Sequence, residues 1–203
     1  MTIATYAQLK TAVTSWMDIT ASDLSTKIDD LVTIAEKRIF REAFTRDNEE
    51  VLSGTITTGV IPVPSDYIKL KFAYIDSNPI RMLARRSNES LLGQYPNRSS
   101  GGRPEAISRQ GTDFIFGPYP DSGYTVAGVY YKKAGTLSSA VYDLFTNNPD
   151  LFLFACLAES EILIGRDARI AVWEAKYNKI LNDVNQLANT EDSSGGSLQI
   201  RLG

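Results

Sequence analysis

One stretch decides the fold: Asn148-Pro149-Asp150-Leu151-Phe152-Leu153-Phe154-Ala155-Cys156-Leu157-Ala158-Glu159-Ser160-Glu161-Ile162-Leu163-Ile164. Asn148 and Pro149 suit the N-cap and the first turn of a helix, and Gly165 ends the pattern. The apolar residues of 150–164 lie on nearly every face of such a helix. A helix without a polar face is central in its bundle, so this stretch predicts a buried helix that other helices surround.

Amphipathic helices are predicted on both sides of this stretch. Asp167 can cap a last helix, whose apolar residues recur at helical spacing over 170–187. Thr5 and Gln8 fit a capping box at the start of a first helix, and a second helix is predicted over about 26–44. The apolar stripe of the second helix consists of Ile28, Leu31, Val32, Ala35, Ile39 and Ala43. These four segments predict a four-helix bundle.

The middle of the chain changes to a strand pattern, rich in Thr, Val, Ile, Tyr, Gly and Pro. Strands are predicted over 51–58, 67–76, 80–83, 106–110, 113–116 and 124–132, with an extended segment at 61–64 and a short helix at 87–93. Short turns such as Gly111-Thr112 suit antiparallel connections. The predicted fold class is therefore α+β. It has a helical bundle over 1–48 and 148–190, an antiparallel β-rich insertion over 49–147 and an extended tail over 191–203.

The tail begins with a polar spacer, Glu191-Asp192-Ser193-Ser194-Gly195-Gly196. It then continues with the strand-like hexapeptide Leu198-Gln199-Ile200-Arg201-Leu202-Gly203, which has apolar residues at alternate positions. Six residues cannot hold a strand alone, so a partner that offers a sheet edge or groove is one interpretation. A frayed terminus is the other interpretation, and the residues alone leave both open.

Composition excludes several classes of site. The chain has no histidine and one cysteine, Cys156, so it cannot build a Ser-His-Asp triad, a Cys-His dyad, a histidine metal site or a thiolate zinc cluster. No catalytic residue, metal or cofactor is predicted. The net charge of −3 disfavours nucleic acid as the main ligand.

The sequence also lacks the signals of secretion and of membrane insertion. The opening residues carry no charged start and no apolar block, so no signal peptide is predicted. The longest apolar stretch, 151–158, is too short to span a bilayer. We expect a soluble protein that is made in a cytoplasm and has no membrane partner.

Four charged residues on the predicted helices allow two interpretations. Glu36 and Arg38 lie on the second helix, and Glu159 and Glu161 lie on the apolar third. A pair of carboxyl groups about 5 to 10 Å apart across a cleft hydrolyses glycosidic bonds, which makes a cell-wall hydrolase the enzyme alternative. An ion pair of Glu159 with Arg38, or with another helix-borne cation, is favoured instead, because it satisfies a charge that is costly when unpaired.

Arginines cluster around and after the end of the third predicted strand, and they are Arg81, Arg85, Arg86, Arg98 and Arg103. Such cations can line a DNA channel, since phosphate contacts need no reading of sequence. They can equally form ion pairs between subunits or a solvated edge that discourages strand aggregation. A nucleic-acid binding module is therefore a second functional alternative.

The chain resembles the head-to-tail adaptor (connector) proteins of tailed bacteriophages, particularly short-tailed ones. The matching segments, in order, are 5–10, 28–39 with its apolar-Ala-Glu-x-Arg core, 61–68, 102–107, 116–120 and 149–155. No one of these motifs is specific alone, and their order and spacing carry the resemblance. The loop 97–102 is rich in Gly and Ser and departs from the pattern.

The resemblance implies a structural protein of the virion neck. Such adaptors form a homo-oligomeric ring, usually of twelve copies, beneath the portal protein, and they join it to tail or nozzle proteins around the channel for viral DNA. The resemblance also implies a C-terminal extension that docks on the portal. On this hypothesis Leu198, Ile200, Arg201 and Leu202 are the portal-binding residues.

Overall fold

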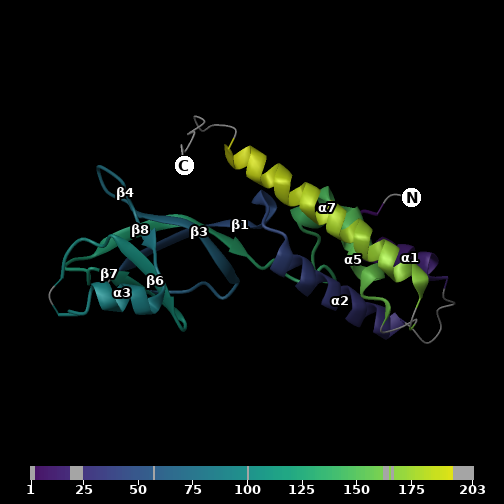
Figure 1. The fold of residues 1–203 in the computed structure, drawn as a ribbon, viewed down its shortest axis with the longest axis horizontal. Coiled ribbons are helices and arrows are strands. Elements are labelled where there is room, and N and C mark those ends of the chain that lie inside the picture. Colours follow the sequence, from purple (N-terminus) through teal and green to yellow (C-terminus); the bar gives the residue numbers. More distant parts are fainter. Residues whose placement is uncertain are drawn as a thin grey trace. The chain divides into compact units, whose positions relative to one another are not determined.

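The computed structural model describes residues 3–18, 25–56, 58–99, 101–161, 165 and 167–193, which divide between two compact units (Figure 1). The strand-rich unit is Glu49–Lys133, and the segments before and after it form the helical unit. This arrangement confirms the α+β class. The predicted insertion over 49–147 is too long, because residues 134–147 belong to the helical unit.

The helical unit is built around one buried helix. Its helices are α1 (Tyr6–Met17), α2 (Ser25–Glu42), α4 (Asp143–Asn147), α5 (Pro149–Ala158) and α7 (Ala168–Ser193), with a 3-10 turn, η1 (Arg46–Asn48). Helix α5 packs against α1, α2, α4 and α7, and seven of its ten residues are buried. The central position predicted from its apolar faces is confirmed.

Local signals set several helix ends. The Thr5 hydroxyl accepts from the Gln8 backbone N–H at 3.2 Å, and the Gln8 side chain accepts from the Ala4 N–H at 2.8 Å. Asp167 accepts from the Arg169 backbone N–H at 2.8 Å at the start of α7. These contacts satisfy N–H groups that have no partner within a helix, as the capping predictions require.

Two helix ends differ from the prediction. Helix α5 ends at Ala158 rather than at 164. After Ala158, the backbone N–H groups of Glu159 and Ser160 donate to carbonyls of the last helical turn. Helix α7 continues to Ser193, so Glu191, Asp192 and Ser193 of the predicted spacer are helical, and Glu191 forms an ion pair with Arg46 at 3.8 Å. The hexapeptide with Leu198, Ile200, Arg201 and Leu202 lies outside the described residues.

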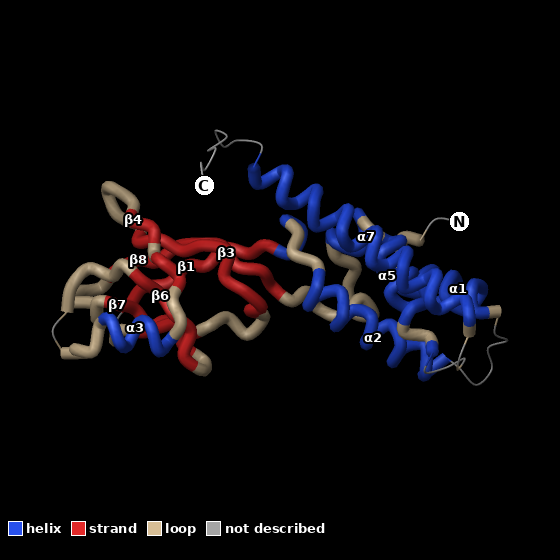
Figure 2. The backbone as a smooth tube through the Cα atoms, in the orientation of Figure 1, coloured by secondary structure: helices blue, strands red, loops and turns tan. Residues whose placement is uncertain are grey.

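The strand-rich unit contains two four-stranded sheets (Figure 2). The first has the order β1 (Glu49–Ile56), β8 (Tyr124–Lys132), β3 (Tyr67–Ile75) and β4 (Arg81–Met82), with every pair antiparallel. The second has the order β2 (Val60–Pro62), β7 (Asp113–Gly117), β6 (Ala106–Gln110) and β5 (Ala84–Arg85).

One strand pair corrects the prediction of a wholly antiparallel insertion. Strands β5 and β6 are parallel, with Ala84 opposite Ala106. Parallel neighbours need a crossover connection, and helix α3 (Asn88–Gln94) lies within the segment that joins them. The short helix predicted at 87–93 is confirmed, with Ser87 as its N-cap.

The core of this unit contains buried side chains from both sheets. Leu52 and Leu70 of the first sheet share a cluster with Ile61, Phe114 and Phe116 of the second. The opposite face of the second sheet is covered by α3, whose buried Leu91 packs with Ala106 and Ile115. Strands β6 and β7 of the second sheet therefore have apolar contacts on both faces.

Candidate interaction sites

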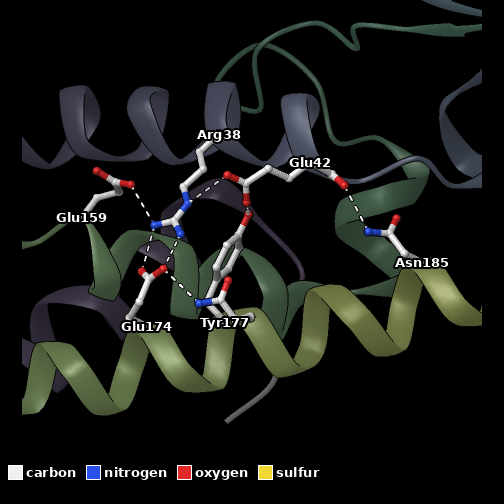
Figure 3. A network of polar contacts seen from close by, with 7 residues as sticks. Arg38, Glu42, Glu159, Glu174, Tyr177 and Asn185 are labelled. Carbon is white, nitrogen blue, oxygen red and sulfur yellow. Dashed lines mark hydrogen bonds and ion pairs between the residues drawn. The ribbon is translucent and has the colours of Figure 1, made fainter.

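A network of charged side chains joins α2 to α5 and α7 around Arg38 (Figure 3). The Arg38 guanidinium donates to Glu159 at 3.0 Å and to both carboxylate oxygens of Glu174, at 2.9 and 2.5 Å. Its Nε lies 3.5 Å from a carboxylate oxygen of Glu42. The predicted ion pair between Arg38 and Glu159 is confirmed.

Tyr177 and Asn185 extend this network along α7. The Tyr177 hydroxyl donates to Glu42 at 2.6 Å, and its ring lies under the Arg38 guanidinium at 4.3 Å from the centroid. The Asn185 amide donates to the Glu42 carbonyl at 3.0 Å and accepts from the Phe44 N–H at 3.0 Å. Asn185 thus holds the backbone at the end of α2, where carbonyls lack partners within the helix.

The electrostatics of the network follow from these contacts. Hydrogen bonds from Arg38 lower the pKa of the Glu174 carboxyl, and bonds to Glu174 raise the pKa of Arg38. Burial raises the pKa of Tyr177, and its bond to Glu42 acts in the same direction. The network keeps Glu174 ionised and Tyr177 protonated, which suits a fixed contact between helices.

Glu174 was not among the predicted residues, although the sequence carries a signal for it. Glu174 comes directly after Trp173 and three residues before Tyr177. Residues three apart share a helix face, so a charge between two buried aromatics of an amphipathic helix indicates a partner on the facing helix.

Three of the five predicted arginines hold loops within the strand-rich unit. Arg81 forms an ion pair with Glu105. Arg98 donates to the Phe116 carbonyl at 2.7 Å and lies 4.8 Å from the centroid of the Tyr119 ring. Arg103 donates to the Ser77 hydroxyl and to the Pro79 carbonyl, the latter at 3.1 Å.

The other two arginines lie elsewhere, on and just after β5. Arg85 donates to the Leu70 carbonyl at 2.8 Å, and the Arg86 backbone N–H donates to the Ile107 carbonyl at 3.0 Å. Both side chains line one pocket together with Lys69 and Arg109. The structure therefore separates the predicted arginine cluster into loop-holding and pocket-lining groups.

Within the described part of the chain, no group of three or more Cys, Asp and Glu residues is placed to hold a metal ion. None of the helices described is long and apolar enough to cross a membrane.

Comparison with known proteins assigns the family. Residues 4–201 match the family model described as SU10 adaptor protein. The chain belongs to the SU10 adaptor family. The match covers both units and confirms the resemblance to phage head-to-tail adaptors. No curated protein matches the chain.

Membership in the SU10 adaptor family fixes the broad role of the protein. It is a structural adaptor of a bacteriophage virion, and it interacts with other proteins of the head and tail. The family is one of structural phage adaptors.

Proposed function

We propose that the protein forms a ring beneath the portal in the virion neck and joins the portal to tail or nozzle proteins. The observation that carries this proposal is the family match over residues 4–201. An adaptor works by binding, so its surfaces and not a catalytic centre carry its function. The resemblance to head-to-tail adaptors implies about twelve copies, and a closed ring of this kind repeats one heterologous contact between neighbours.

The portal contact uses the C-terminal tail. Leu198, Ile200 and Leu202 enter pockets at a sheet edge or groove of the portal, main-chain groups add hydrogen bonds, and Arg201 contributes a charged contact. One tail binds weakly. A ring of tails gains avidity, since each docked tail raises the effective concentration of the next.

Viral DNA passes through the lumen of this ring without specific contacts and leaves by the same route at ejection. The chain carries a net charge of −3, which disfavours strong binding to the phosphate backbone. Arg81, Arg98 and Arg103 have partners within their own unit, which favours a role in holding loops over a role in gripping DNA.

Mixing the protein with its cognate portal ring tests this function. Native mass spectrometry of the mixture is expected to give one portal ring carrying a full set of adaptor subunits. A portal ring that stays free at micromolar adaptor concentration contradicts the proposal. Steeply salt-dependent DNA binding by the isolated subunit instead indicates a nucleic-acid binding module.

A further inference from the structure

A small pocket opens in the strand-rich unit between residues of both sheets. We call it the cationic pocket, and its lining residues are Tyr67, Lys69, Leu70, Arg85, Arg86, Ile107, Ser108, Arg109 and Phe114. They come from β3, from β5 and the residue after it, and from β6 and β7. Its volume is about 230 Å³. A pocket whose backbone lies mostly in paired strands is preformed.

The charge of this pocket is entirely of one sign. Four of its nine lining residues are cations, and none is Asp or Glu, although acidic residues outnumber basic ones in the whole chain. Cations gathered this way without a carboxylate among them raise the local concentration of anions. The pocket is therefore complementary to a negatively charged group.

Two of the cations are held in place. The Arg85 guanidinium donates to the Leu70 carbonyl at 2.8 Å. Arg109 donates from Nε to the Gly111 carbonyl at 3.1 Å and lies 5.2 Å from the centroid of the Tyr67 ring. A carbonyl oxygen carries no full negative charge, so both guanidinium groups keep their positive charge. Each guanidinium also keeps further N–H donors for a ligand. Fixed donors lose less entropy when an anion binds.

Apart from Ser108, whose hydroxyl donates to Asn88 at 2.6 Å, the remaining lining is apolar or aromatic. Leu70, Ile107 and Phe114 belong to the core between the sheets, and each is buried. The Tyr67 ring packs edge-on against Phe114 at 5.3 Å between centroids. A ligand that fits this pocket needs an apolar part as well as a negative charge.

We propose that the cationic pocket binds an acidic segment of a partner protein, in which a carboxylate lies next to an apolar side chain. The apolar side chain covers Leu70, Ile107 and Phe114, and the carboxylate accepts hydrogen bonds from Arg85, Arg86 and Arg109. Carboxylates pair with the planar guanidinium through two parallel hydrogen bonds.

Size and shape favour a peptide over DNA in this pocket. Its volume is below the range of about 300–1,000 Å³ for small-molecule sites, so it suits one or two side chains. Phosphates of a duplex lie on a convex surface and carry no apolar group, so they would leave the apolar lining exposed. This contact is separate from the proposed portal contact of the tail, and it requires no ring.

Peptide binding to the full chain tests the proposal. The probe is the peptide acetyl-Phe-Asp-Phe-Glu-amide, and shifts of the backbone amide resonances of Leu70 and Ile107 report its binding. The amide analogue acetyl-Phe-Asn-Phe-Gln-amide removes the charge, and acetyl-Ala-Asp-Ala-Glu-amide removes the apolar groups. We expect each analogue to bind at least about tenfold more weakly than the probe.

Substitutions locate the site. Arg86→Gln is expected to weaken binding of the probe peptide about tenfold, because it removes one charge-assisted contact at an exposed position. Arg41→Gln, at an exposed position on α2 of the helical unit, is the matched control and is expected to leave binding unchanged.

Four results would overturn the proposal. Two concern the peptides, namely equal binding of the uncharged analogue and no shift at Leu70 and Ile107 with any probe. The other two are preferential binding of a short DNA duplex that Arg86→Gln weakens, and displacement of the probe by inorganic phosphate at equal concentration. The peptide comparison uses the unmodified chain, so it decides the matter even if Arg86→Gln fails to fold.

Discussion

Arg38 and Glu174 lie on helices from opposite ends of the chain and are joined by two hydrogen bonds, of 2.9 and 2.5 Å. This paired geometry fixes the separation and the rotation of α2 against α7, because a planar guanidinium meets a carboxylate in one plane. Glu159, the residue that follows α5, binds the same guanidinium at 3.0 Å. One side chain therefore links three helices of the bundle.

Replacing Arg38 by alanine should destabilise the helical unit by about 2 kcal/mol or more, since it leaves the Glu159 and Glu174 carboxylates side by side without their cation. Arg38→Lys should lose less, because it keeps the charge and loses the paired geometry. Urea unfolding followed by far-UV circular dichroism measures both changes. Arg41→Ala, at an exposed position on the same helix, should change stability by less than about 0.5 kcal/mol. Equal losses of stability for Arg38→Ala and Arg41→Ala would show that the Arg38 network does not stabilise the folded helical unit.

Acid should weaken the same contact. The pKa of Glu174 is below its ordinary value of 4.5 in the folded protein, chiefly because of the hydrogen bonds from Arg38. Its contribution to stability is therefore complete above about pH 4.5 and is lost as the pH falls through the lowered pKa. Urea unfolding across this pH range should show a steeper loss for the natural chain than for Glu174→Gln. Parallel curves for the two proteins would contradict this linkage.

The two phenylalanines of α5, Phe152 and Phe154, should differ in their effect on stability. Phe152 is fully buried, with edge-on contacts to Phe145 at 5.2 Å and to Tyr142 at 5.9 Å between ring centroids. Phe154 is only partly buried and meets the half-exposed Trp16 at 5.8 Å. Phe152→Ala should cost about 3–5 kcal/mol and Phe154→Ala about 1–2 kcal/mol in urea unfolding. A larger loss of stability for Phe154→Ala than for Phe152→Ala would mean that α5 presents a different face to the core of the bundle.

Gly128 is required where β8 pairs with β3. A Cβ at this position would meet the Phe72 carbonyl oxygen and would lie 2.8 Å from the Ala73 Cα, both on the neighbouring backbone. Gly128→Ala should therefore destabilise the first sheet by about 1–3 kcal/mol. Gly135→Ala is the control, since a Cβ there has no atom within 4 Å. Thermal unfolding of the two variants tests the contrast, and an unchanged midpoint for Gly128→Ala would rule out this β3–β8 pairing.

Periodicity predicted the elements that are decided locally. The central helix followed from an apolar pattern without a polar face, and strands β6 and β8 have the predicted bounds, 106–110 and 124–132. Two helix caps, at Thr5 and Asp167, followed from side chains that bond to N–H groups close by in the chain. In each case the residues that decide the structure lie within a few positions of one another.

Features that depend on distant partners were predicted less well. The parallel pairing of β5 with β6 depends on where α3 packs, and two-residue strands carry no periodic signal. Helix α7 extends to Ser193, since no glycine or proline lies between its first residue, Ala168, and Gly195, and Glu191 has Arg46 as a partner. The cationic pocket combines residues of four segments, so spacing alone cannot reveal it. Of the arginines predicted as one group, only Arg85 and Arg86 line it.

The direct test of the adaptor account is the mass of the complex that the cognate portal ring forms with the full chain and with a chain lacking residues 194–203. This deletion leaves α7 whole, because the helix ends at Ser193. The account predicts that the full chain loads the portal ring with a complete set of subunits and that the shortened chain, folded to the same degree, leaves it bare. Equal loading by the two chains would contradict it.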